Sequence, residues 1–74
     1  MIELDAKLAA LSNEAQDLVV EACDLCAQVG AKWDAKDLTG IAHVMRDAAG
    51  KHRRVAELYD RIADECAKAQ KELS

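Results

Sequence analysis

The sequence contains no proline and no phenylalanine, and it has one tryptophan, one tyrosine and three glycines among its 74 residues. Without proline, no backbone N–H group is missing from the interior of a helix. No stretch alternates apolar and polar residues as half-buried strands do, and no run of about 18 apolar residues occurs. These absences argue against a sheet and against a membrane span. The abundant alanine instead favours long helices with closely approaching backbones.

The first residues, Met-Ile-Glu-Leu-Asp, lack the basic segment and the apolar stretch of a signal peptide. The chain has three cysteines, and an odd number without a secretion signal favours reduced thiols over a disulfide framework. We therefore expect a cytoplasmic protein, located in the host cytoplasm if a phage encodes it.

Leucine recurs every seven residues in the first third of the chain, and a second apolar row follows each leucine by four positions. The two rows are Leu4, Leu11, Leu18 and Leu25, and Leu8, Ala15, Ala22 and Val29. Such rows are the d and a positions of a four-heptad amphipathic helix. The pattern predicts a helix over residues 3–29 that lies against other helices.

A second phased row continues to the C-terminus in alternating steps of three and four residues. It consists of Leu38, Ile41, Met45, Ala48, His52, Val55, Tyr59, Ile62, Cys66, Ala69 and Leu73. The row stays in phase across Gly50, which a real break would have no reason to preserve, and one glycine inside a helix costs only about 1 kcal/mol relative to alanine. One continuous helix is therefore favoured over the alternative, a three-helix bundle with a break at Gly50.

The connection between the two helices carries recognisable end signals. Gly30 can take the left-handed conformation that ends helices, and Asp34 is a suitable N-cap, with Trp33 before it as a hydrophobic staple. We predict a turn over residues 30–34 and a second helix over residues 35–73, with a competing start one turn later. The whole chain is then a single domain.

The predicted fold is an all-α, antiparallel helical hairpin of the coiled-coil type. The turn places Leu11 opposite His52 and Leu4 opposite Tyr59, so that residues beyond Ile62 overhang the first helix. Two helices enclose a core that a solitary chain barely stabilises. A further apolar strip beside the main rows, including Val44, suits a bundle of three or four helices better than an isolated pair. We expect a homodimer that forms a four-helix bundle, or a hairpin that docks on the helices of another protein. The residues expected to contact a partner are Val19, Val20, Cys23, Cys26, Trp33, Leu58, Ile62 and Leu73.

Cys23 and Cys26 lie one helical turn apart and can offer two thiolates to a metal or a redox couple. Their place near the end of the first helix, with Glu21 and Asp24 close by, disfavours the thiolate form. In a continuous hairpin Cys66 is on the order of 40 Å away and cannot complete a metal site. Packing is the favoured role, no metal or cofactor is expected, and a thiol or metal-binding protein is the alternative function.

His52 occupies a position in the apolar row, where it can fix register, act as a proton-sensitive switch or form a hydrogen bond at the bundle edge. It belongs to the only basic cluster, which runs from Lys51 to Arg54. That cluster is too short to indicate nucleic-acid binding on a chain of net charge −4.

The sequence has no glycine-rich phosphate loop, activated serine or His-Glu metal motif, so we expect no enzyme. We predict a non-enzymatic helical interaction module that self-associates and binds another protein, without contact to nucleic acid or membrane. A small adaptor and a phage- or plasmid-type inhibitor both fit this description.

The tryptophan beside the connection resembles the small helical-hairpin substrates of type VII secretion, which carry a Trp-x-Gly turn between two helices. The resemblance covers the hairpin outline only. Gly30 precedes Trp33 here, and Ala63 stands four residues after Tyr59, where that family's export motif has an acid. We do not assign the chain to that family.

Overall fold

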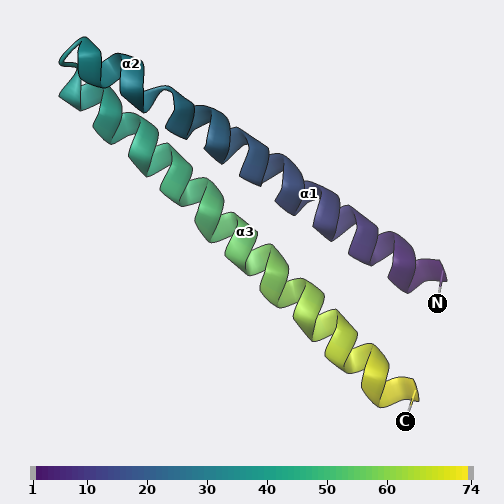
Figure 1. The fold of residues 1–74 in the computed structure, drawn as a ribbon. Coiled ribbons are helices and arrows are strands. Elements are labelled where there is room, and N and C mark those ends of the chain that lie inside the picture. Colours follow the sequence, from purple (N-terminus) through teal and green to yellow (C-terminus); the bar gives the residue numbers. More distant parts are fainter. Residues whose placement is uncertain (1, 74) are drawn as a thin grey trace.

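The described residues fold as an antiparallel helical hairpin (Figure 1). The computed structural model describes residues 2–73, except for the side chain of Ile2. Helix α1 spans Ile2–Ala27, α2 spans Val29–Asp34 and α3 spans Leu38–Leu73. No strand occurs within this range. The predicted all-α hairpin is confirmed.

The first arm of the hairpin consists of α1 and α2, which are separated by the single turn residue Gln28. Gln28 keeps right-handed helical torsion angles, with φ −79° and ψ −15°, so α2 continues close to the direction of α1 (Figure 1). The second arm, α3, returns alongside and ends beside the start of α1. The Cα atoms form a rod of 58 × 16 × 11 Å.

The turn between the arms lies later than the sequence predicts. Lys36 takes the left-handed conformation, with φ 60°, and its N–H donates to the carbonyl of Trp33 while the N–H of Asp37 donates to the carbonyl of Lys32. This is a Schellman motif, which most often carries glycine where Lys36 stands. Gly30 is an ordinary residue of α2. The prediction of a turn over residues 30–34 is therefore wrong by several residues.

The cap of α3 is also one turn later than predicted. The N–H of Gly40 donates to Oδ1 of Asp37 at 2.9 Å, so Asp37 and not Asp34 caps the helix. A Cβ at residue 40 would overlap the Asp37 carboxylate as it is placed here, so the side chain of Asp37 would have to shift. The predicted second-helix start at residue 35 is replaced by Leu38, close to the competing start.

Moving the turn changes which residues lie opposite one another by about one heptad. Leu11 packs with Leu58 in the core and not opposite His52 as predicted. Leu4 and Ala69 line the same groove at the open end, so Leu4 is not opposite Tyr59 either. The predicted overhang beyond Ile62 is therefore absent, and the two arms end together (Figure 1).

The seam, meaning the surface along which the arms touch, uses both predicted rows of α1. The residues of these two rows are all buried or half-buried. The predicted apolar pattern of α3 consists of two rows with seven-residue spacing. Only one of these rows faces α1, namely Ile41, Ala48, Val55, Ile62 and Ala69. The other predicted row is exposed at Met45, His52, Tyr59, Cys66 and Leu73. Its place in the seam is taken by Val44, Lys51, Leu58 and Glu65.

Compared with the predicted orientation, α3 is rotated about its own axis. The rotation brings into the seam a third row, in which Val44 and Leu58 are apolar. Leu58 is completely buried and Val44 is 7% exposed, so the rotation gives the centre of the seam a leucine and a valine. Lys51 and Glu65 lie half-buried at the same seam row and send their charged ends to acidic and basic residues of α1. Long charged side chains can bury their stems in this way while the charge remains in water.

Gly50 lies inside α3 without interrupting it. Nothing lies within 4 Å of the position a Cβ would take there. The prediction of one continuous second helix is confirmed, and the alternative with a break at Gly50 is excluded.

Candidate functional site

One flank of the seam is closed by ion pairs between α1 and α3. Nζ of Lys7 lies 2.8 Å from Oε1 of Glu65, and Nζ of Lys51 lies 3.2 Å from Oε2 of Glu21. Between them, Nε of Arg54 lies 3.0 Å from Oε2 of Glu14. The three α1 residues recur every seven positions, so the same edge of α1 faces α3 along its length. Exposed pairs of this kind stabilise only weakly, but they select the register.

The ion pairs also displace two ionisation equilibria. A hydrogen bond donated by Lys7 lowers the pKa of Glu65 below its ordinary value, and the positive charge of Lys7 adds to the effect. Hydrogen bonds to Glu14 and then Glu57 raise the pKa of Arg54. Both shifts stabilise the charged forms, so this flank is a set of salt bridges with a structural role.

The opposite flank of the seam is apolar and uncovered. Between Met45 and Cys66, each exposed residue of the outward α3 row follows a seam residue by one position, as Tyr59 follows Leu58, whereas Arg54 precedes the seam residue Val55. One residue turns a helix by about 100°, so the exposed row and the ion-paired row lie on opposite sides of the seam. We call this apolar surface the open face. It comprises Leu38, Met45, His52, Tyr59, Cys66 and Leu73 of α3 with Val19, Cys23 and Cys26 of α1.

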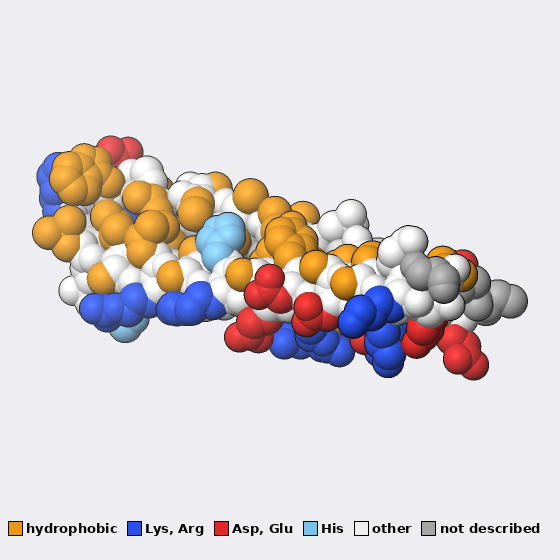
Figure 2. Space-filling view, turned by 90° about the horizontal axis from the view of Figure 1, so that it is seen from below, with side chains coloured by type: hydrophobic (Ala, Val, Ile, Leu, Met, Phe, Trp, Pro, Cys, Tyr) orange, Lys and Arg blue, Asp and Glu red, His pale blue; other side chains and the backbone are white. Residues whose placement is uncertain are grey.

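The ion pairs fix which residues of the open face lie side by side. Measured along the length of the hairpin, the ion pairs place Cys26 of α1 beside Met45 of α3, and Val19 beside His52. The largest side chains stand well out of the fold, with Tyr59 56% and Leu38 62% exposed. Figure 2 shows hydrophobic side chains gathered in a band along this side of the molecule, with charged side chains along the edge below. A contiguous exposed apolar band of this kind is typical of an interaction surface.

The predicted contact residues are distributed over three environments. Cys23, Cys26 and Leu73 are exposed on the open face. Val19 and Ile62 are half-buried and pack against the core cluster. Leu58 is buried, whereas Val20 and Trp33 are exposed away from the open face.

The assignment of Leu58 to an outer strip is wrong, because its side chain is completely buried between the two arms. Val20 is 59% exposed but lies two residues from the seam residues Leu18 and Ala22, which places it on the far side of α1. The sequence interpretation instead missed Met45 and Tyr59 as surface residues. Their exposure depends on ion pairs between the two arms, such as that of Lys51 with Glu21, which hold Lys51 in the seam.

The turn presents Trp33 at the closed end of the hairpin. The indole is 57% exposed, and Nζ of Lys36 lies 5.2 Å from the centroid of its ring. The expected staple of Trp33 on Leu38 does not form, since Asp37 caps the helix and both apolar side chains are exposed. A second basic residue of the turn, Lys32, lies 3.8 Å from Oδ2 of Asp37. Trp33 is thus an exposed aromatic side chain on a backbone held by capping bonds.

The cysteines do not converge on a single site. Cys23, Cys26 and Cys66 are free and exposed. Cys66 belongs to the part of α3 near the open end, whereas the other two lie toward the turn. Within residues 2–73, no group of three or more His, Cys, Asp or Glu side chains is placed to hold a metal ion.

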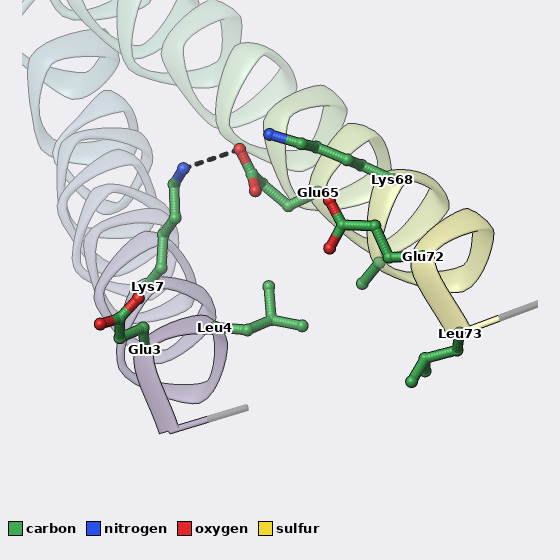
Figure 3. Close-up of a pocket in the computed structure, with 8 residues that line it drawn as sticks. Glu3, Leu4, Lys7, Glu65, Lys68, Glu72 and Leu73 are labelled. Carbon is green, nitrogen blue, oxygen red and sulfur yellow. Dashed lines mark ion pairs between the residues drawn. The ribbon is translucent and has the colours of Figure 1, made fainter.

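A groove of about 310 Å³ opens between the ends of α1 and α3 (Figure 3). It lies beside the Lys7 to Glu65 ion pair, with Leu4 and Ala69 among its lining residues. Further charged residues of both signs, Glu3, Lys68 and Glu72, surround it. This mixture favours neither an anionic nor a cationic ligand. The open face is therefore the stronger candidate for function.

No protein-family model, curated protein or solved structure matches the chain. In the described part of the chain, none of the helices combines the length and the apolar character needed to cross a membrane.

Proposed function

We propose that this protein is a non-enzymatic helical interaction module that self-associates through the open face and binds another protein. The observation that carries the proposal is the asymmetry of the two flanks of the seam. One flank is occupied by ion pairs between α1 and α3. The other leaves Met45, Tyr59 and Leu73 at 39%, 56% and 67% exposure.

The cost of leaving this face in water supports association. Complete burial of a large apolar side chain stabilises by ~1.5–3 kcal/mol, so half-exposed leucine, methionine and tyrosine side chains retain a sizeable part of that driving force. A two-fold contact between identical chains would use each of these residues twice. A face of this length and shape fits another helix or helix pair, because helices pack with their axes ~8–10 Å apart.

Trp33 gives the proposed partner protein a point of contact outside the open face. Tryptophan is among the residues that most often dominate binding energy at interfaces. Its position at the turn sets it apart from the middle of the open face, so it can engage another protein while α3 is occupied. A chain with these two surfaces would work as a small adaptor or inhibitor.

A pair of glutamate substitutions tests the proposal. Met45→Glu places a charge in the open face, whereas Val20→Glu places the same charge on an exposed valine on the far side of α1. We expect size-exclusion chromatography with light scattering to report a smaller mass for Met45→Glu than for the wild type. Val20→Glu should keep the wild-type mass, and far-UV circular dichroism should show both variants helical.

Two results would contradict the proposal. One is a wild-type chain that stays monomeric at every concentration reached. The other is a Met45→Glu variant that associates as strongly as Val20→Glu, since the open face would then play no part in association.

A further inference from the structure

The outward surface of α3 changes its charge at the middle of the helix. Residues 43–54 contain four bases and one acid, whereas residues 57–65 contain four acids and one base. Lys51, Arg54 and Glu65 are engaged with α1. Among the described residues, the exposed side chains of Arg46, Asp47, Arg53, Asp60, Arg61 and Asp64 take part in none of the ion pairs, which leaves a net positive charge in the first half and a net negative charge in the second. The charge separation on this surface is therefore not neutralised within the chain.

The apolar row of the open face has its midpoint at the same place. The row runs from Leu38 to Leu73, and its centre lies between His52 and Tyr59. The change of charge falls between Arg54 and Glu57, inside the same interval. Two independent patterns, one apolar and one electrostatic, thus share a centre near Val55 and Ala56.

We infer that the occupant of the open face is a second copy of this chain, with its α3 antiparallel to the first about a two-fold axis between Val55 and Ala56. The inference rests on the proposed self-association and specifies its geometry. It commits to the α3 surface as the contact, with Met45 of one copy beside Cys66 of the other and His52 beside Tyr59.

The helical rise shows that charges and apolar residues fit the same axis. At a rise of 1.5 Å per residue, Arg53 lies ~4 Å along α3 from the two-fold axis, and Asp60 lies ~7 Å from it in the other direction. The two-fold operation therefore places Asp60 of the second copy within ~3 Å of Arg53 of the first, measured along the helix. Arg46 lies in the same heptad row as Arg53, ~14 Å along α3 from the axis, and so meets the acidic half of the second copy. The basic half of each α3 therefore faces the acidic half of the other.

A parallel arrangement has the opposite electrostatic consequence. It would set Arg53 beside Arg53 and Asp60 beside Asp60, and like charges across an interface oppose association. Alanines accompany the apolar row along α3, at Ala42, Ala49, Ala56 and Ala63. Their small side chains allow the two α3 helices to approach closely in the antiparallel arrangement that the charges favour.

Disulfide formation at chosen positions tests the orientation. Cys23→Ala/Cys26→Ala leaves Cys66 as the only thiol, and Met45→Cys is then added to this background. Mild oxidation should link position 45 of one copy to Cys66 of the other, and peptide mapping should recover that linkage. Without Met45→Cys, no linked dimer should form, because two Cys66 residues would lie ~30 Å apart, far beyond the ~4.4–6.8 Å between Cα atoms in a disulfide.

The same samples separate failure of the inference from failure of the proposed function. Before oxidation, their masses are measured by sedimentation. A monomer overturns both proposals. A dimer that links through Cys66 alone, or that gives no linkage between positions 45 and 66, leaves self-association standing and overturns the antiparallel geometry.

Charge exchange gives a second test without new cysteines. Arg46→Glu/Arg53→Glu makes the outer surface of α3 acidic, and Asp60→Lys/Asp64→Lys makes it basic. Each variant alone should associate at least about tenfold more weakly than the wild type, because each antiparallel pair now opposes like charges. A mixture of the two variants should regain association as a heterodimer. Equal self-association of both variants, with no preference for the mixed dimer, would refute the antiparallel pairing.

Discussion

Leu58 and Tyr59 are adjacent in sequence but serve two different surfaces, so truncating each to alanine separates folding from association. Leu58 is completely buried in the seam, and Tyr59 is 56% exposed on the open face. Replacing a buried leucine by alanine costs ~2–5 kcal/mol, and a two-helix core can partly collapse around the cavity, so we expect about 2–3 kcal/mol for Leu58→Ala. Small proteins gain roughly 0.05–0.15 kcal/mol per residue, or ~4–11 kcal/mol for a chain of this length. Leu58→Ala therefore removes a large part of the stability.

Urea unfolding followed by circular dichroism at low and high protein concentration measures both effects. Leu58→Ala should lower the free energy of unfolding at either concentration. Tyr59→Ala should cost less than ~1 kcal/mol in the dilute sample, where chains are monomeric, and more in the concentrated one. If Tyr59→Ala destabilises the dilute chain as much as Leu58→Ala does, Tyr59 lies in the seam and the orientation of α3 described here is wrong.

Four further substitutions give measurable shifts in unfolding free energy. Lys36→Gly should stabilise by about 1 kcal/mol, because glycine takes the left-handed conformation without the strain that other residues incur there; no gain would argue against the Schellman turn. Gly50→Ala should stabilise by ~0.5–1 kcal/mol, whereas Gly40→Ala should gain less because its Cβ displaces the capping carboxylate; equal gains would place the cap elsewhere. Glu65→Gln should lower stability at neutral pH, since the hydrogen bond from Lys7 lowers the folded-state pKa of Glu65 and stabilises the fold above the ordinary carboxyl value of ~4.3. That difference from wild type should shrink as the pH falls through and below this value, and a difference that persists at low pH would contradict the assignment.

The first arm of the hairpin could be predicted from sequence because α1 has only one pair of apolar rows at heptad spacing. Leu11, Ala15 and Ala22 are buried as expected. The continuity of α3 could be predicted for a similar reason, since the phase of its apolar residues is preserved across Gly50. In both cases a long periodic pattern outweighs a single local signal.

The turn was harder to place because two stretches carry plausible end signals. Gly30 and Asp34 have the residue types that end and start helices, yet the chain uses Lys36 and Asp37 three residues further on. Lysine in the left-handed conformation gives no sequence signal, and the Asp37 carboxylate lies where a Cβ of residue 40 would be. A displacement of three or four residues at the turn moves every opposing pair by twice that amount, which is about one heptad. The two α1 rows and one α3 row therefore stayed on the seam while their partners changed.

The exposure of Met45 and Tyr59 on the open face was missed for a different reason. Helix α3 has three rows that carry apolar residues, whereas its hairpin partner α1 covers only two of them. Periodicity alone does not show which two rows are covered. The choice depends on contacts between segments far apart in sequence, such as Glu21 with Lys51 and Lys7 with Glu65. The same contacts bury Leu58 and expose Tyr59.

Sedimentation equilibrium of the wild-type chain and of Tyr59→Glu tests most directly whether two chains meet at the open face. The wild type should approach twice the 8.1 kDa mass of one chain as its concentration is raised over about two decades. Tyr59→Glu should remain at the mass of one chain while keeping its helical circular dichroism. A wild type that stays at 8.1 kDa throughout, or a Tyr59→Glu variant that dimerises as the wild type does, would contradict the account.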